Sequence, residues 1–214
     1  MKKIFISLII VLVGLFLITL SIVKQSSQIT IKPISKPLVE NNAVRLPVDD
    51  SGPIFGNPGS PITVTEFFSF NCNDCIKIHT ELVNFINQNP SHVRLISQGV
   101  AIENWLGNKN NYPLLALYCA EQQNKYWDFL NKSIQLKKID EINIKNLVSE
   151  IKLNSDVFEN CLKENTNIAK IENLQDKLKS FGIIETPLIF VDNKKINLTD
   201  GVTISTILNS LIEK

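Results

Sequence analysis

Two cysteines separated by two residues form the part of this sequence that is best suited to chemistry. Cys72-Asn73-Asp74-Cys75 follows an apolar, strand-like stretch at 62–68 and precedes a stretch with helical spacing. If the second cysteine lies in the first helical turn, the first sulfur lies at the helix N-terminus, where unpaired N–H groups and the helix dipole favour a thiolate. The thiolate is the form of cysteine that attacks disulfides. The spacing therefore predicts a redox-active dithiol, with Cys72 as the attacking thiol and Cys75 as the resolving thiol.

The same cysteine spacing can also form half of a zinc site. A structural zinc site needs four ligands, usually from two such pairs. The other two cysteines stand alone, and the chain has only two histidines, His79 and His92. We therefore expect neither a metal nor an organic cofactor. His79 lies one helical turn after Cys75, either near the dithiol or on an exposed helix face, and we favour the exposed face.

Glu66 precedes Cys72 by six residues and lies in the middle of the apolar stretch. A carboxylate in a buried strand would be largely desolvated and could exchange a proton with Cys75 during turnover. A glutamate on an exposed edge strand would do neither. The spacing by itself leaves both alternatives open.

Pro187 introduces a hydrophobic strand directly after Thr186. A cis bond before Pro187 would expose the Thr186 backbone to an incoming extended polypeptide and keep an N–H group away from the sulfurs. The alternative is an ordinary trans proline that opens a strand. The sequence does not decide between them.

The elements that must position these residues alternate between strand and helix. Strand-like stretches at 62–68, 92–97 and 186–191 are joined by a helix after Cys75 and by a helical block at about 103–181, and a return strand at 196–198 and a helix at 202–213 follow. The first helix of the block is expected to run from Pro113 to Leu130. This order predicts an α/β thioredoxin fold with an inserted all-helical subdomain.

Cys119 and Cys161 lie in separate predicted helices of the insertion. In an oxidising compartment we expect them to form a structural disulfide. The alternative is two small buried side chains that never meet.

The N-terminus indicates the compartment. After Met1-Lys2-Lys3, residues 4–23 carry no charge, and this length approaches the roughly 20 residues that span a bilayer. We expect an uncleaved signal anchor at 1–23, a proline-rich linker at 24–55 and the folded domain at 56–214, placed outside the cytoplasm. A cleaved signal is the alternative.

The net charge of +1, from 22 Lys plus Arg and 21 Asp plus Glu, gives little support for nucleic-acid binding.

Several segments resemble those of the DsbA-like thiol–disulfide oxidoreductases. The stretch Glu66 to Cys75 is similar to the family's strand and active-site motif, and Thr186-Pro187 is similar to its cis-proline loop. The segments 118–122 and 158–162 resemble the subgroup with a second cysteine pair in the insertion. The resemblance covers about 55–214.

This resemblance implies a periplasmic, monomeric enzyme that introduces disulfides into exported proteins and is reoxidised by a quinone-linked membrane partner. The chain departs from the family at Asn73-Asp74, where the family usually has proline followed by an uncharged residue or histidine. A carboxylate beside the thiolate opposes it, so we expect a weaker oxidant. The alternatives are a reductase or isomerase of the same fold, and a non-catalytic anchored chaperone or binding protein with structural cysteines.

Overall fold

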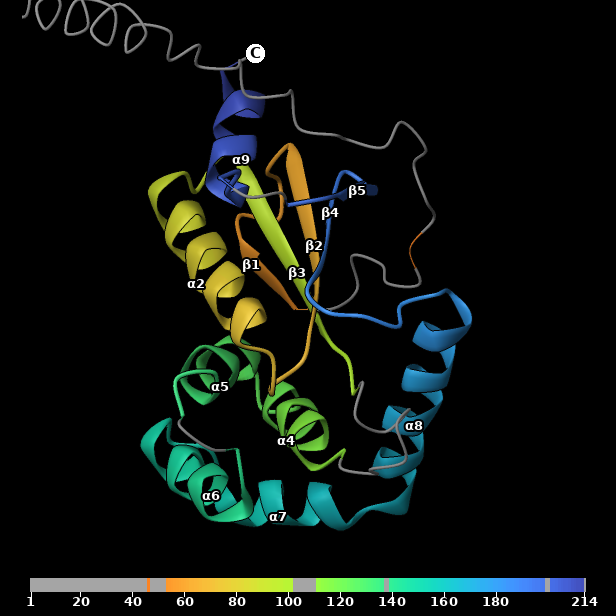
Figure 1. Ribbon diagram of the computed structural model, residues 1–214. Helices are drawn as coiled ribbons and strands as arrows, with labels where there is room; N and C mark the ends of the chain where they lie inside the picture. Colours follow the sequence, from red (N-terminus) through yellow and green to blue (C-terminus); the bar gives the residue numbers. More distant parts are fainter. Residues whose placement is uncertain (1–45, 47–52, 102–110, 137–138, 199–200, 214) are drawn as a thin grey trace, which may run out of the picture. The chain divides into compact units, whose positions relative to one another are not determined.

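The computed structural model describes residues 46, 53–101, 111–136, 139–198 and 201–213, all within the unit Pro37–Lys214 (Figure 1). The signal anchor expected at 1–23 and most of the expected linker lie outside these residues. In the ranges that are described, no helix combines the length and the hydropathy that crossing a bilayer requires.

A five-stranded mixed sheet forms the centre of the domain. Its strand order is β1-β3-β2-β4-β5; β2 and β3 are parallel and the other neighbours are antiparallel. The strands are β1 (Ile54–Gly56), β2 (Ile62–Phe68), β3 (Val93–Gly99), β4 (Leu188–Val191) and β5 (Lys194–Ile196). β2 is thus a central strand, buried on both sides, and the expected fold class is confirmed.

Alternation along β2 sends its side chains to two separate cores. Ile62 and Val64 pack on one face with residues of α2 (Asn73–Gln88) and α9 (Ile204–Ile212). Phe67 packs on the other face with Leu178 of α8 (Asn165–Ser180). The sheet therefore has helices on both faces (Figure 1).

The helical insertion lies between β3 and β4 and has its own core. Its other helices are α4 (Tyr112–Glu121), α5 (Tyr126–Ser133), α6 (Glu141–Glu150) and α7 (Ser155–Lys163). The single helix expected from Pro113 to Leu130 is wrong, because the chain turns between α4 and α5. Asn124 has a φ of 57°, a left-handed conformation that interrupts a helix.

Two strand boundaries also differ from expectation. β1 lies partly within the expected linker and pairs with β3, from Ile54 opposite Ile96 to Gly56 opposite Arg94. The hairpin after β4 needs only Asp192 and Asn193, with φ of 48° and 62°, so β5 begins two residues before the expected return strand. Two consecutive left-handed residues are typical of the tight turn that joins antiparallel strands.

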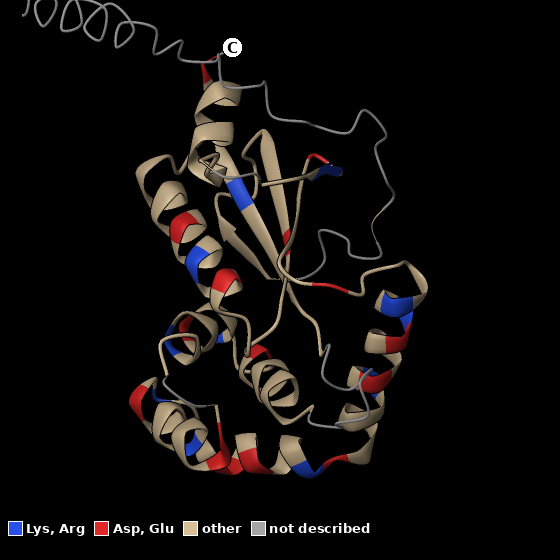
Figure 2. Ribbon diagram, in the orientation of Figure 1, with Lys and Arg blue, Asp and Glu red and all other residues tan. Residues whose placement is uncertain are grey.

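Charged side chains of both signs are interspersed over the described helices (Figure 2). On α2, for example, Lys77 pairs with Asp74 at 2.9 Å. This distribution agrees with the balanced composition and shows no single-sign stripe in this view.

Candidate active site

The dithiol lies at the start of α2, as the cysteine spacing predicts. Cys72 is the N-cap residue, and its Sγ accepts a hydrogen bond of 3.1 Å from the backbone N–H of Cys75. Cys72 is half-buried, whereas Cys75 is 2% exposed. The two sulfurs form a disulfide. The arrangement presents one sulfur to an attacking thiolate and places the other in the core.

Glu66 is buried on the face of the sheet that α2 covers. It is 2% exposed and continues the row of Ile62 and Val64 on that face, so the exposed-edge alternative does not apply. Its Oε1 accepts a hydrogen bond of 2.5 Å from Ser97 Oγ on β3, the residue paired with it in the sheet. A buried carboxylate needs such partners because an unpaired charge is costly away from water.

His79 provides the second partner of Glu66, and its expected place on an exposed helix face is wrong. The ring is 2% exposed and its Nδ1 bonds Glu66 Oε1, while Nε2 lies 2.9 Å from Asn131 Oδ1 on α5. Burial works to lower the pKa of His79, but the attraction of Glu66 and the two hydrogen bonds together raise it above its usual 6.5. The helical spacing indicates this burial, because His79 lies on the same inward-facing stripe of α2 as Cys75, Leu82 and Ile86.

Tyr126 closes the same buried region from α5. Its hydroxyl donates a hydrogen bond of 2.5 Å to the carbonyl oxygen of Ser97. Burial, followed by the charge of Glu66, raises the pKa of Tyr126 far above its usual 10, so the phenol stays protonated and can donate this hydrogen bond.

The peptide bond between Thr186 and Pro187 is cis. Both residues line a groove of about 450 Å³ together with the start of α2 and the strands β4 and β5. Apolar side chains of the groove include Ile78, Leu188 and Leu198. The structure thus brings the predicted loop and Asp74, within the dithiol motif, to one surface, although they are far apart in sequence.

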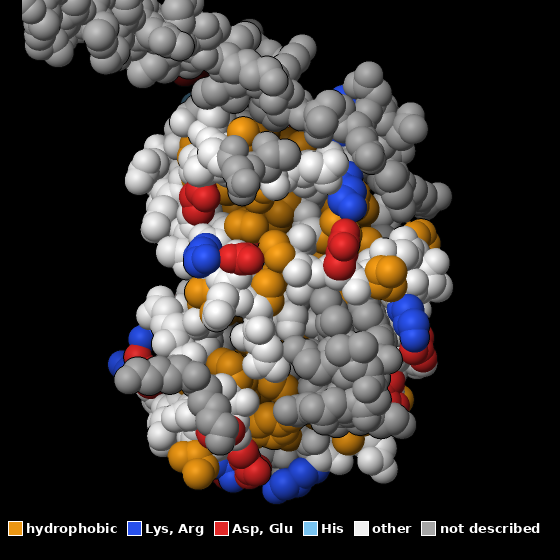
Figure 3. Space-filling model, viewed as in Figure 1, with side chains coloured by type: hydrophobic (Ala, Val, Ile, Leu, Met, Phe, Trp, Pro, Cys, Tyr) orange, Lys and Arg blue, Asp and Glu red, His pale blue; other side chains and the backbone are white. Residues whose placement is uncertain are grey.

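Two ion pairs border this groove. Lys77 and Asp74 are 2.9 Å apart, and Lys195 and Glu185 are 3.3 Å apart. Figure 3 shows hydrophobic side chains gathered between charged ones on this face of the molecule. The groove has the apolar floor and polar margins expected for binding an extended polypeptide segment.

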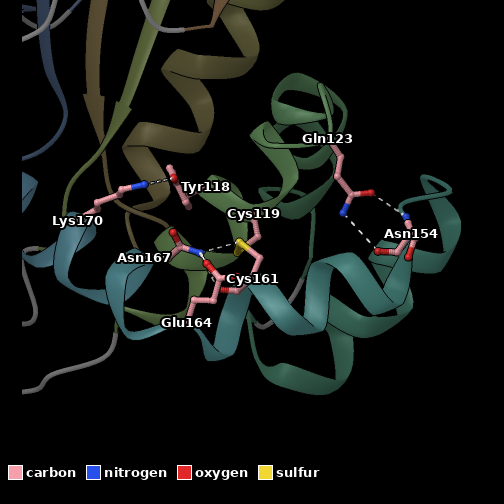
Figure 4. The surroundings of a disulfide bond; sticks show 8 residues. All are labelled: Tyr118, Cys119, Gln123, Asn154, Cys161, Glu164, Asn167 and Lys170. Atoms are coloured by element: carbon pink, nitrogen blue, oxygen red, sulfur yellow. Dashed lines mark hydrogen bonds between the residues drawn. A yellow bond between two sulfur atoms is a disulfide. The ribbon is translucent and has the colours of Figure 1, made fainter.

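The other two cysteines are joined in the insertion. Cys119 of α4 and Cys161 of α7 form a disulfide with a Cα–Cα distance of 5.8 Å (Figure 4). Asn167 covers it from α8, where its Nδ2 lies 3.5 Å from Cys161 Sγ and donates to the Cys161 carbonyl at 3.1 Å. Cys119 is fully buried and Cys161 is 8% exposed. A bridge so enclosed is suited to a structural role.

Sequence reasoning missed the polar and aromatic residues around Glu66 and His79, namely Ser97, Asn131, Tyr126 and Trp127. Ser97 continues the buried, alternating row of Val93 and Leu95 on β3, and a polar residue in such a row is a usable signal. Asn131 and Trp127 come from an inserted helix, and nothing in their spacing indicates that they contact α2. Within the described ranges, no three His, Cys, Asp or Glu side chains are grouped so that they could hold a metal ion.

Comparisons with known structures agree with this geometry. A thioredoxin-like oxidoreductase from Silicibacter pomeroyi DSS-3 has a TM-score of 0.63 at 23% identity, covering 77% of this chain and 92% of its own. The thiol-disulfide exchange protein alpha-DsbA2 from Wolbachia pipientis has a TM-score of 0.60 at 22% identity, covering 77% and 86%. BdbD from Bacillus subtilis has a TM-score of 0.57 at 20% identity, covering 76% and 89%. No curated protein matches the chain.

The solved structures that this chain resembles share its fold, and a disulfide lies at the start of α2, where the cysteine spacing predicts a redox-active dithiol. The chain belongs to the thioredoxin family, since residues 49–210 match the family model described as Thioredoxin.

Proposed function

We propose that this chain is an extracytoplasmic oxidase that passes the Cys72–Cys75 disulfide to exported proteins. The observation that carries the proposal is the asymmetry of the two sulfurs. Cys72 is half-buried and its Sγ accepts a backbone hydrogen bond at the helix N-terminus, whereas Cys75 is buried. Such a hydrogen bond and the helix dipole stabilise the Cys72 thiolate that leaves when a substrate disulfide is completed.

The transfer consists of two thiol–disulfide exchanges. A substrate thiolate attacks Cys72 Sγ, the Cys72–Cys75 bond breaks, and its electron pair leaves on Cys75 Sγ, which takes up a proton. A second substrate thiolate then attacks the substrate sulfur of the mixed disulfide and expels the Cys72 thiolate. The substrate loses two electrons and gains a disulfide, and the enzyme is left as the dithiol.

The groove gives the substrate its place. An extended segment lying between the two ion pairs would contact the apolar side chains of Ile78 and Leu198 and the backbone around Thr186. Few side chains of the substrate need be specified in this mode, because main-chain contacts and apolar burial contribute most of the affinity. This suits an enzyme that acts on many exported proteins.

Glu66 is the proton-exchange group of the proposal. It is buried on the face of β2 that α2 covers, the helix that carries Cys75 in its first turn.

The uncharged run at 4–23 supports an inner-membrane anchor, with 24–55 as a linker that holds a monomeric domain outside the cytoplasm. A quinone-linked membrane protein would reoxidise the dithiol. No metal or organic cofactor takes part.

Trapping of mixed disulfides tests the roles of the cysteines. Cys75→Ser should accumulate mixed disulfides with client proteins that carry a disulfide, because the Cys72 thiolate attacks that disulfide and Cys75 is no longer present to release the client, while Cys72→Ser should accumulate none. Gel mobility with and without reductant, followed by peptide mapping, measures the difference. Equal trapping by both variants would refute the assignment of Cys72 as the attacking thiol.

The reduction potential tests the direction. Equilibration with glutathione should place this disulfide above the potential of the glutathione pool, as an oxidase requires. A potential well below that of glutathione would favour the reductase alternative. A Cys72 thiol that does not react with a small alkylating reagent after mild reduction would favour the non-catalytic binding protein.

A further inference from the structure

The Glu66–His79 pair is a buried charged group that the disulfide exchange itself does not explain. Both side chains are 2% exposed and lie between β2 and α2. His79 occurs one helical turn after Cys75, so the two side chains share a face of α2 and their Cβ atoms are about 5–6 Å apart. His79 therefore lies one helical turn from Cys75, the residue whose sulfur gains and loses a proton.

The hydrogen bonds of the ring define its charge. Nδ1 faces Glu66 Oε1, and Nε2 faces Asn131 Oδ1 at 2.9 Å. With the Glu66 carboxylate facing Nδ1 and the Asn131 amide oxygen facing Nε2, this arrangement suits a ring in which both nitrogens donate, which is the imidazolium form. The direction of the His79 pKa, upward from 6.5, agrees with this assignment.

The helical insertion supplies the rest of the enclosure. Trp127 of α5 stacks on the His79 ring with centroids 6.4 Å apart and an interplanar angle of 17°. Figure 1 shows α5 beside the first turns of α2. Asn131 and Trp127 are four residues apart and lie on the same face of α5. Asn131 bonds the edge of the His79 ring, and Trp127 stacks on its plane. Among the described residues, Ser97 and Tyr126 are further polar side chains near this pair, and both are neutral.

We propose that His79 is a positioning residue for proton transfer at the dithiol: held by Asn131 and Trp127, it presents a hydrogen bond and a positive charge to the buried Glu66 carboxylate and orients it to take the Cys75 proton. The inference rests on the proposed role of Glu66. When a small disulfide such as oxidised glutathione has joined Cys72, the Cys75 thiol attacks Cys72 Sγ and expels the glutathione thiolate. Glu66 takes the Cys75 proton in this step and returns it to the solvent or the leaving sulfur. Cys75 is oxidised and the glutathione sulfur is reduced.

The test measures ring closure in the full-length protein against pH, with oxidised glutathione as the oxidant. His79→Gln should lower the rate at pH 7 by about tenfold, less than the roughly 10²–10⁴-fold typical of losing an acid–base group itself, because Glu66 remains. The shape of the pH–rate profile should change as well, because Glu66 loses the hydrogen bond and the positive charge that His79 presents. The exposed histidine gives the matched control, since His92→Gln should leave both rate and profile unchanged.

Double variants separate positioning from a merely structural role. Glu66→Gln should slow ring closure, and adding His79→Gln should change the pH profile no further, because His79 acts through Glu66. The double variant also keeps the site foldable, since it replaces the ion pair by two neutral amides. Independent, additive losses would overturn the proposal, as would an unchanged profile in His79→Gln. If Glu66→Gln has no effect, the proton role of Glu66 and this proposal both fail, while trapping by Cys75→Ser would still support the exchange function.

Nuclear magnetic resonance gives a second readout that does not depend on activity. The chain has two histidines, so the ring nitrogen signals of His79 can be assigned by comparison with His92→Gln. In the oxidised protein both His79 nitrogens should be protonated at pH 7. Asn131→Leu should lower the pH at which the ring titrates, whereas Asn131→Asp should not. A neutral His79 at pH 7 in the wild-type protein would overturn the proposal.

Discussion

Cys72 is activated by its position more than by its neighbours in the motif. The backbone N–H of Cys75 donates to its Sγ, and the N-terminus of α2 points at the same sulfur. Asp74 opposes this stabilisation, but its carboxylate is 71% exposed and pairs with Lys77. The residues between the cysteines should therefore tune the thiolate modestly.

Asp74→Asn should make the disulfide a slightly stronger oxidant, and Asp74→His should do so more. Removing the negative charge stabilises the Cys72 thiolate, and an added imidazolium stabilises it further. Because the site is exposed and screened, we expect a rise of about 10–20 mV for Asp74→Asn. Glutathione equilibration measures the potential, and ultraviolet absorbance follows the thiolate.

Lys77→Met is a control that should shift the reduction potential in the opposite direction. It leaves the Asp74 charge unscreened, so the potential should fall. If none of the three variants moves the potential, the carboxylate does not act on the sulfur and the helix terminus controls this site.

At the scale of elements, the insertion has two roles. Its α5 reaches the redox site through Asn131 and Trp127, while α4 and α7 are joined by the second disulfide. The N-cap of α7 is tied to the turn after α4, since Asn154 N–H donates to Gln123 Oε1 at 2.9 Å (Figure 4). The disulfide thus stabilises a helical unit that also encloses His79.

Cys119→Ala with Cys161→Ala should lower the free energy of unfolding by about 2–5 kcal/mol, because the bridge restricts the unfolded chain. Urea unfolding of the oxidised protein measures the loss. The rate at which the protein first reacts with a dithiol should stay the same, since neither cysteine touches Cys72. Equal stability, or a lost first reaction, would contradict a purely structural role.

At the scale of the whole molecule, the groove joins segments from three parts of the chain. Leu198 is half-buried in its lining, and Leu198→Glu should place a charge where an apolar substrate side chain binds. The KM for a peptide dithiol should rise about tenfold, which corresponds to about 1.4 kcal/mol of lost apolar contact. The reaction with dithiothreitol should not change.

Val157→Glu is the matched control for the groove. Val157 is 49% exposed on α7 and does not line the groove. An equal rise in KM from this variant would show a general effect of charge and would count against the groove as the binding site.

The stability of the oxidised protein should fall as pH rises through the folded-state pKa of His79. That pKa is raised above 6.5, so the stabilisation is fully present below pH 6.5 and is lost at higher pH. Urea unfolding at a series of pH values measures the decline, at a slope of up to about 1.4 kcal/mol per pH unit. Glu66→Gln with His79→Gln should remove this component, and His92→Gln should retain it. If the free energy of unfolding still declines with pH in the double variant, other titratable groups cause the decline.

Local patterns in the sequence determined the fold class and the dithiol. The cysteine spacing, the strand before it and the inward stripe of α2 all depend on neighbours within a few residues, and local backbone geometry imposes those relations. The same reasoning failed at Asn124, where a single left-handed residue divides an otherwise helical stretch, and at Asp192-Asn193, where the turn proved shorter than expected.

Tertiary structure alone decided the surroundings of the dithiol. Whether Glu66 is buried depends on β2 lying between β3 and β4, and strand order is not a local property. The His79 ring is held by Asn131, which is 52 residues away on an inserted helix. Burial and pairing of polar groups arise from contacts between distant segments, and such contacts leave no periodic signal in the sequence.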